Sequence, residues 1–352
     1  MLKHKVTKAL ENIKHIELNE RQKKVLQAII QLYILNASPI GSRTLSKYLY
    51  EKVSPATIRN VMADLEELKL IDHPHTSAGR VPTDLGYRYY VDTLLQYEQL
   101  SQKEIEVLTE SLNRSESVLK DASRILGLLT KYLTIVALPQ VEKSRILKID
   151  LIQITDEKLL FVLALDSNIV KTVTLETNFD LKSQDLPLLT SYLNEKISGK
   201  TLEFIKQNFK ELVLETDLFE TPLIRLFVDS FEDIFDIKNS DDLIHISGTQ
   251  NLLQYPEFNN PEKIKGIIEL IESEDIIIHL LDQIKNSASD LTVLIGSELK
   301  ENRLSDYSIV VSNYSFGSSI GSIGVIGPKR MHYSKIIALV KHTSEILERR
   351  YS

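Results

Sequence analysis

The first hundred residues carry three helical patterns separated by short breaks. The first helix is predicted to begin after Asn19, a good N-cap residue, and to end before Ser38-Pro39, because the residue preceding a proline avoids the helical region. A second, short helix is predicted to begin at Ser42. The third begins at Ser54-Pro55, which supply an N-cap and a first helical residue. Its apolar residues recur at helical spacing and form one stripe: Ile58, Val61, Met62, Leu65 and Leu68.

The opposite face of that third helix is small, polar and basic in its first half. This face holds Ala56, Thr57, Arg59, Asn60 and Ala63. A recognition helix needs this layout, because its N-terminal residues enter the major groove, where Arg can bind guanine and Asn can bind adenine through two hydrogen bonds. The N–H groups at the helix start also favour a phosphate. An ordinary amphipathic helix with a polar outer face would show the same pattern, so both interpretations stay open.

A polar segment at residues 73–82 has the pattern of a short β-hairpin wing. Two prolines bracket small residues, with Gly79 suited to the tip and Arg80 able to reach a phosphate or the minor groove. The pair His73 and His75 could be taken for a metal site, but no third ligand is near, so no metal is predicted. A further helix is expected from the cap residue at 83 to about residue 100. Three helices and a wing make a winged helix-turn-helix.

The middle of the chain changes from a helical pattern to a strand pattern. From Ile105 to Leu133, apolar residues recur in steps of three and four, which predicts one long helix. This stripe suits a seam between subunits, or packing on a sheet within the subunit. An antiparallel meander is then predicted at 147–151, 159–165 and 169–175, with Leu147, Ile149 and Leu151 alternating with polar residues as in a half-buried strand.

Helical signals return in the next segment and strands follow them. Helices are predicted from Asp185, with Gly199 near its C-terminal cap, and from Thr221-Pro222. Strands are predicted at 276–281, 291–295, 307–311 and 323–326, and a last helix from about Ser334. A sheet, then helices, then a sheet again indicates a helical insert inside an α/β domain.

Composition and charge narrow the function classes. The chain has 352 residues, no Cys and a net charge of −7, but residues 1–63 hold eleven Lys and Arg against four Glu, a net charge of +7. A basic end on an acidic body suggests that this end meets a polyanion, although a solvated basic helix face would look the same. The absence of Cys excludes disulfide-stapled folds and thiolate metal sites. No apolar run is long enough to span a membrane and no signal peptide is recognisable, so a cytoplasmic protein is expected.

Two sequence features could be taken for a ligand-binding or catalytic site, but neither supports one. The glycines at 317, 321, 324 and 327 do not form a phosphate-binding loop, because Pro328 intervenes and Lys329-Arg330 is followed by Met. Glu298 could line a pocket or could be a surface carboxylate. No catalytic set is found, so neither an enzyme nor a cofactor is predicted.

Several long strings resemble the HrcA family of bacterial heat-inducible transcription repressors. They are PIGSRTL at 39–45, SPATIRNVMADLEELKLI at 54–71, HPHTSAGRVPTDLGYRYYVD at 73–92, SGTQNLLQYPEF at 247–258, IGSE at 295–298 and GVIGPKRMHY at 324–333. The resemblance spans nearly the whole chain and is weakest from about residue 100 to 245. One departure is Lys69, where the family pattern leads us to expect a glycine.

The resemblance implies an α+β multidomain fold, an N-terminal winged helix-turn-helix followed by a GAF-like α/β domain that is interrupted by a mainly helical dimerising insert. The expected domains are a winged helix at 1–100, the first GAF-like part at 101–183, the insert at 184–245 and the second GAF-like part at 246–352. A homodimer would bind double-stranded DNA at an inverted-repeat operator upstream of chaperone genes, with its activity maintained by the chaperonin GroEL. The alternative is a regulator gated by a metabolite bound in the GAF-like domain.

Seven residues are expected to contact DNA. Thr57, Arg59 and Asn60 are predicted to reach base edges. Arg43, Lys47 and Ser54 are predicted to contact phosphate, and Arg80 to act from the wing.

Overall fold

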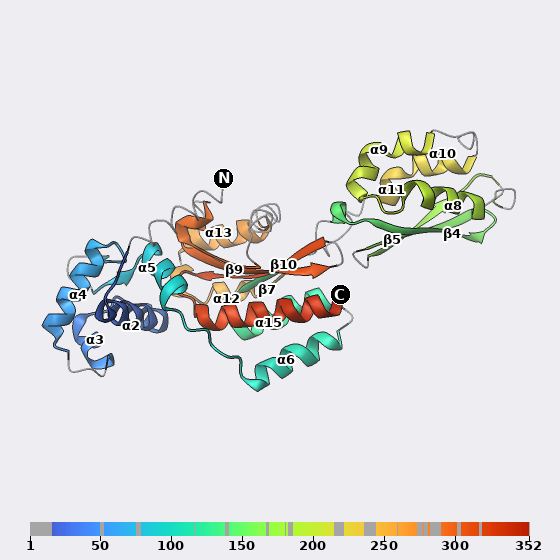
Figure 1. The fold of residues 1–352 in the computed structure, drawn as a ribbon. Helices are drawn as coiled ribbons and strands as arrows, with labels where there is room; N and C mark the ends of the chain where they lie inside the picture. Colours follow the sequence, from blue (N-terminus) through green and yellow to red (C-terminus); the bar gives the residue numbers. More distant parts are fainter. Residues whose placement is uncertain are drawn as a thin grey trace. The chain divides into compact units, whose positions relative to one another are not determined.

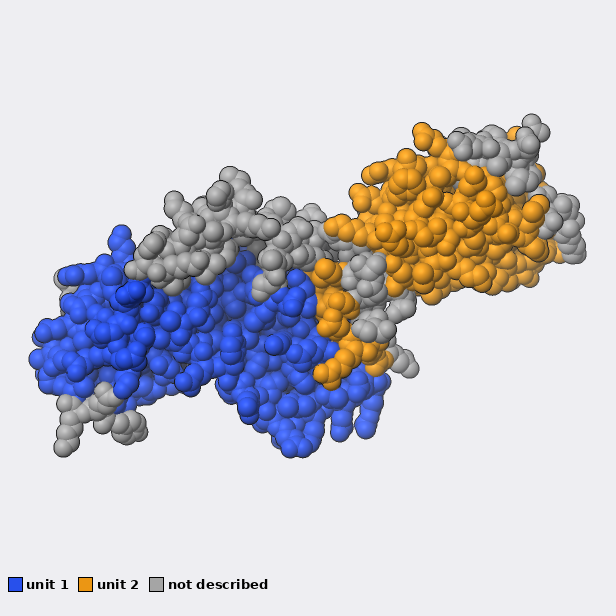
Figure 2. Space-filling view, in the orientation of Figure 1, with its two compact units in different colours: residues 1–136, 246–313, 323–346 blue, residues 137–245, 314–322, 347–352 orange. Residues whose placement is uncertain are grey.

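The computed structural model contains two compact units. The described residues are 16–49, 53–74, 79–115, 117–137, 141–166, 169–179, 181, 186–214, 222–235, 244–258, 260–272, 277, 281, 290–300, 304–316 and 319–351. The larger unit joins residues 1–136, 246–313 and 323–346, and the smaller joins 137–245, 314–322 and 347–352 (Figure 2).

A winged helix-turn-helix begins the larger unit (Figure 1). Asn19 forms a capping box with Gln22 at the start of the first helix, and Ser54 caps the third. The two wing strands are antiparallel, and Ile40 adds an isolated bridge to Arg80. The elements are α2 (Glu20–Asn36), α3 (Ser42–Tyr48), α4 (Pro55–Glu67), β1 (Ile71–Asp72), β2 (Val81–Pro82) and α5 (Asp84–Tyr89), which continues as a π-helical turn (Tyr90–Leu94). The predicted winged helix is confirmed, but its last helix ends at Leu94 rather than near residue 100, because Leu95 is extended.

Lys69 and Gly79 show why the chain turns as it does around the wing. Lys69 has a φ of 60°, and α4 ends in a Schellman motif, with Lys69 N bonded to Glu66 O at 2.9 Å and Leu70 N to Leu65 O at 3.0 Å. A left-handed residue at this position favours glycine, so the Lys is strained. A Cβ on Gly79 would lie 2.5 Å from the Ile40 carbonyl carbon. We expected Gly79 to serve the tip, but the close approach to Ile40 is what requires it; residues 75–78 lie outside the described residues.

The long helix predicted from Ile105 is two helices. They are α6 (Gln102–Asn113) and α7 (Val118–Thr130), and they pack against each other. The break lies near Ser115, whose hydroxyl donates to Asp121 Oδ2 at 2.6 Å. Leu112 and Leu126 of the predicted stripe are fully buried within the chain. The stripe therefore serves packing within the subunit, one of the two alternatives that its pattern allowed.

A five-stranded sheet with strand order β7-β3-β10-β9-β8 forms the α/β core. Three predicted strands and the last helix are confirmed, but residues 277 and 281 of the strand predicted at 276–281 are helical. Glu298 neither lines a pocket nor lies on the surface, since its side chain is only 9% exposed and pairs with Arg88. In Figure 1, α15 and α13 lie on opposite sides of the sheet. The elements are β3 (Leu133–Ala137), β7 (Ile244–Ser247), α12 (Thr249–Leu252), a 3-10 turn (Pro256–Phe258), α13 (Pro261–Glu272), β8 (Leu291–Ile295), a 3-10 turn (Gly296–Leu299), β9 (Tyr307–Phe316), β10 (Ser319–Pro328) and α15 (Tyr333–Tyr351).

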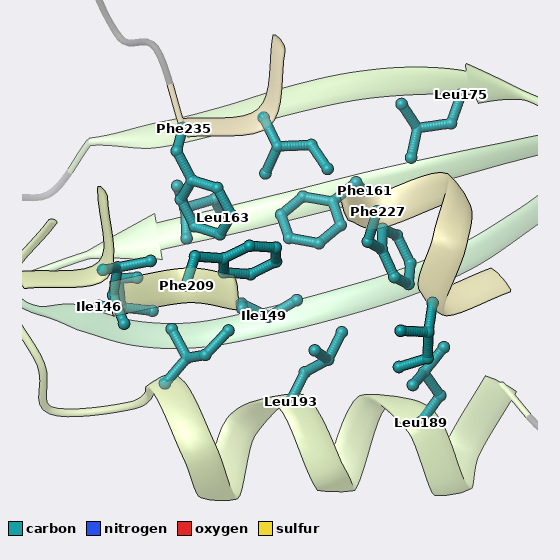
Figure 3. Close-up of a cluster of buried hydrophobic side chains, with 14 of the residues drawn as sticks. Ile146, Ile149, Phe161, Leu163, Leu175, Leu189, Leu193, Phe209, Phe227 and Phe235 are labelled. Atoms are coloured by element: carbon teal, nitrogen blue, oxygen red, sulfur yellow. The ribbon is translucent and has the colours of Figure 1, made fainter. Parts of the chain in front are cut away.

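Among its described residues, the smaller unit combines a three-stranded meander with four helices. Its elements are a 3-10 turn (Val141–Lys143), β4 (Ile146–Thr155), β5 (Lys158–Leu165), β6 (Val170–Glu176), α8 (Leu186–Ile197), α9 (Leu202–Leu214), α10 (Pro222–Asp229) and α11 (Phe231–Phe235). Figure 3 shows side chains of these helices, such as Leu193 and Phe227, meeting Ile149 and Phe161 of the strands. No space for a water molecule is left among them. The meander, which we expected in the GAF-like domain, thus forms a separate sheet with the helices, and the compact unit begins at Ala137 rather than at residue 184.

The start of β4 departs from the predicted alternation. The pairing register shifts between Ile146 and Lys148, as in a β-bulge. Ile146 and Ile149 are therefore buried, whereas Leu147, expected to point inward, is 57% exposed.

Candidate nucleic-acid interface

The N-terminal half of α4 is held by its cap and presents a polar face to solvent. Ser54 Oγ accepts from Thr57 N at 3.1 Å and lies 3.0 Å from Thr57 Oγ1. Pro55 occupies the first turn, where a missing N–H costs nothing. The apolar stripe from Ile58 to Leu65 is buried, so the opposite face looks outward. That exposed face carries Arg59 and Asn60, which is the geometry that a recognition helix requires.

Two cations lie on the preceding helix. Arg43 and Lys47 of α3 are both exposed and are one helical turn apart, so they share a face. The helices α3 and α4 pack together, and Ser46 Oγ donates to Val53 O at 2.8 Å across the connection. The structure thus brings the expected phosphate-binding and base-reading residues into one helix-turn-helix.

Ser54 and Thr57 have less freedom than the sequence suggested, because each hydroxyl is bonded to the other residue. In the helix cap, one lone pair of Ser54 Oγ accepts the hydrogen bond from the backbone N–H of Thr57. Thr57 is half-buried, and its methyl group is the part best suited to a thymine methyl group.

Arg80 has an ion-pair partner within the chain. Its Nε donates to Glu66 Oε2 on α4 at 2.7 Å, and Glu66 Oε1 contacts Nδ1 of His73, which directly follows β1. Glu66 therefore joins α4 to the residue that follows β1 and to the residue that precedes β2. Sequence reasoning missed this role, because Glu66 is seven residues from His73 and fourteen from Arg80, and no local pattern marks such a pair.

Two of these residues, Glu66 and His73, also bear on the metal site for which the sequence offers no third ligand. Ligand atoms of Glu66, Asp72 and His73 lie within 4.8 Å of one another, so the fold does supply additional ligand types. However, the two Glu66 oxygens already meet His73 and the Arg80 guanidinium, whose positive charge opposes a metal ion. We interpret the group as a polar clasp between wing and helix. His75 lies outside the described residues.

Family models match both parts of this architecture. A model described as a winged helix-turn-helix transcription repressor, HrcA DNA-binding, matches residues 17–106, and the HrcA protein C terminal domain matches residues 116–337. The chain belongs to the HrcA family. Among the described residues of this HrcA chain, no helix combines the length and apolar character needed to cross a bilayer.

Curated HrcA relatives align along almost the whole chain. The heat-inducible transcription repressor HrcA of Pelotomaculum thermopropionicum is 36% identical, and the match covers 95% of this chain and 98% of the relative. That of Chlorobium phaeobacteroides is 33% identical over 94% of this chain and 97% of the relative. A solved structure, described only as a hypothetical protein at 2.2 Å resolution, superposes with a TM-score of 0.64 at 25% identity, covering 95% of this chain and 99% of the other.

Proposed function

We propose that this chain is a sequence-specific DNA-binding repressor, and not an enzyme, that acts in the cytoplasm as a homodimer on the heat-inducible operons of chaperone genes. The observation that carries the proposal is the exposed face of α4, with Arg59 and Asn60 directly after a capped helix start, in a winged helix of the HrcA family. Curated relatives that match along the whole chain are named heat-inducible transcription repressors.

The proposed roles follow from position and chemistry. Arg59, Asn60 and the Thr57 methyl group read base edges in the major groove. Exposed Arg43 and Lys47 contact phosphates beside the same groove, and the capped start of α4 at Ser54 faces a phosphate with its N–H groups. Arg80, which is held by Glu66, places the wing near the sugar-phosphate backbone of the DNA and contributes positive charge there.

A homodimer suits an inverted-repeat operator, because two-fold symmetry in the protein matches two-fold symmetry in the DNA. The smaller unit supports self-association by its sheet. Its helices pack on one face of the meander, and the other face leaves Ile152, Ile154 and Val170 at least 50% exposed. Exposed apolar residues gathered on one sheet face are typical of an interaction surface.

The chaperonin GroEL is proposed to maintain the active population of the repressor. A chaperone occupied by unfolded clients would then leave less active repressor, and the chaperone genes would be expressed. The support is family membership together with the general argument that a regulator's active population can depend on a folding catalyst.

The test is fluorescence anisotropy on an inverted-repeat duplex from a bacterial chaperonin promoter and on a scrambled duplex. Both titrations use about 150 mM salt, because affinity for DNA depends steeply on salt. Preference for the repeat by about three decades or more supports the repressor. Equal weak binding that persists after chaperonin and ATP are added contradicts it.

A further inference from the structure

Three motifs from the C-terminal third of the chain meet the winged helix inside the larger unit. They are IGSE at 295–298, GPKR at 327–330 and the Glu257 of QYPEF. IGSE and GPKR contact α5 and the end of α2 directly, whereas Glu257 acts through Arg330, with which it pairs. None of these motifs belongs to the DNA-contacting face, so the proposed function does not yet explain them.

The central contact is a buried ion pair between Arg88 of α5 and Glu298. Their side chains are 7% and 9% exposed. Arg88 Nε donates to Glu298 Oε1 at 2.8 Å, Nη2 donates to Oε2 of the same carboxylate, and Nη2 also donates to Val293 O at 2.6 Å. Two parallel bonds between a planar guanidinium and a carboxylate fix orientation as well as distance. Burial alone would lower the pKa of Arg88, but the bonds and charges of Glu298 and Asp92 raise it, so the group remains charged.

A second contact lies one turn earlier on α5, at Asp84. Its Oδ2 accepts from Ser297 N at 2.9 Å, and its Oδ1 accepts from Lys329 Nζ at 2.7 Å. Gly296 has a φ of 52°, and a Cβ there would lie 2.4 Å from Asp84 Oδ2. The IGSE turn therefore needs glycine both for its backbone and for room. Asp84 and Arg88 are four residues apart, so one face of α5 carries both contacts.

A third contact holds the end of α2. Arg330 Nη1 donates to Ile34 O at 3.2 Å, while Nη2 donates to Glu257 Oε2 at 3.0 Å. The guanidinium also lies over the Tyr255 ring, 5.4 Å from its centroid. Contacts on two different helices of the winged helix resist rotation as well as separation. We call these three contacts the junction.

We propose that Glu298 is a positioning residue for DNA recognition, because through Arg88 it fixes the orientation of the winged helix on the α/β core. This inference rests on the proposed function, in which two recognition helices must hold the spacing of an inverted repeat. A winged helix that is loosened from its core still fits one half-site. It binds both half-sites together more weakly, because the second binding event then loses effective concentration.

The test compares binding to a duplex with the full inverted repeat and binding to a duplex that carries a single half-site. Glu298→Gln keeps the side-chain shape and removes the charge, and Glu110→Gln removes the charge of an exposed ion pair on α6 as the matched control. We expect Glu298→Gln to lose about tenfold or more in full-repeat affinity, with an unchanged half-site affinity. Unchanged or increased full-repeat affinity, or an equal loss on both duplexes, overturns the inference. If the unmodified chain shows no preference for the repeat over a scrambled duplex, the proposed function fails and the positioning role fails with it.

A second measurement needs no DNA and covers the case in which Glu298→Gln folds poorly. The chain contains no Cys, so nitroxide labels can be placed at two exposed positions, by Arg21→Cys on α2 and Lys341→Cys on α15. Double electron–electron resonance on labelled chain diluted with unlabelled chain gives the distribution of distances between the two labels. We expect Glu298→Asp, which keeps the charge but shortens the side chain and so loosens its bonds to Arg88, to broaden this distribution while the thermal unfolding curve stays cooperative. An unbroadened distribution in a folded variant overturns the proposal.

Discussion

Glu66 on α4 and Arg80 on the wing are joined by a 2.7 Å ion pair. Both side chains are about a quarter exposed, at 25% and 27%, so the pair is partly screened and contributes roughly 0.2–1 kcal/mol to stability. Its larger effect is geometric, because Glu66 also meets His73 and so holds the chain next to each wing strand on α4.

Glu66→Gln is therefore expected to lower the affinity for operator DNA, and this free-energy change should exceed the change in the free energy of unfolding. Removing an acidic charge near DNA would by itself strengthen binding, so the matched control is Glu67→Gln, an exposed neighbour. Anisotropy should show lower affinity for Glu66→Gln than for Glu67→Gln. Equal affinities would mean that the clasp does not place the wing.

Asn60→Ala is expected to cost about 1–3 kcal/mol at one operator base pair and to relax specificity there. Asn60 is exposed on α4, and its amide can make two hydrogen bonds to adenine. The measurement is a set of operator duplexes with single substitutions. A variant that discriminates among them as the unmodified chain does would remove Asn60 from the base-reading set.

Lys47→Ala is expected to weaken binding to all sequences alike. The dependence of log affinity on log salt should become shallower by about one unit, because one phosphate contact is lost. Lys47 is exposed on α3 with no role in the buried core. Titrations on specific and scrambled duplexes at several salt concentrations measure this slope, and an unchanged slope would place Lys47 away from the backbone.

Lys69→Gly is expected to stabilise the winged helix by about 1 kcal/mol, because a left-handed backbone is costly for a residue with a Cβ. Lys69 has a φ of 60° after α4. Urea unfolding measures the change. Ala63→Gly, at an exposed position inside α4, is the opposite case and should lower stability by about 1 kcal/mol. A destabilised Lys69→Gly would show that the Lys side chain contributes more than the backbone strain costs.

Glu104→Gln is expected to destabilise the contact between α6 and α15 at neutral pH and to have a smaller effect in acid. The hydrogen bond from Lys335, with those from Ser101, lowers the pKa of Glu104 to about 2. A lowered pKa in the folded state stabilises the fold above the ordinary value of 4.5, and this stabilisation is lost as pH falls toward 2. Urea unfolding at pH 7 and pH 3 tests this, with exposed Glu106→Gln as the control. A difference that stays constant with pH would contradict it.

The sequence predicts those parts of the fold whose causes are local. Asn19, Ser54 and Thr83 cap helices by bonds to residues three positions on, so α2, α4 and α5 begin where expected. The bulge that exposes Leu147 depends on pairing with another strand, so simple alternation along the sequence places Leu147 on the wrong face. The pairs Glu66–Arg80 and Arg88–Glu298 join residues 14 and 210 positions apart, and only the folded chain brings them together.

The order of synthesis follows from the interrupted architecture. Strand β3 ends at Ala137, but its neighbour β10 begins only at Ser319, and Arg88 leaves the ribosome 210 residues before Glu298. At about 5–20 residues per second, this interval lasts roughly 10–40 s. During that time the winged helix has no core to dock on, and β3 has no β10 beside it. Each newly made repressor thus passes through a period in which apolar surface awaits a late partner, and the demand on the folding machinery rises with its rate of synthesis.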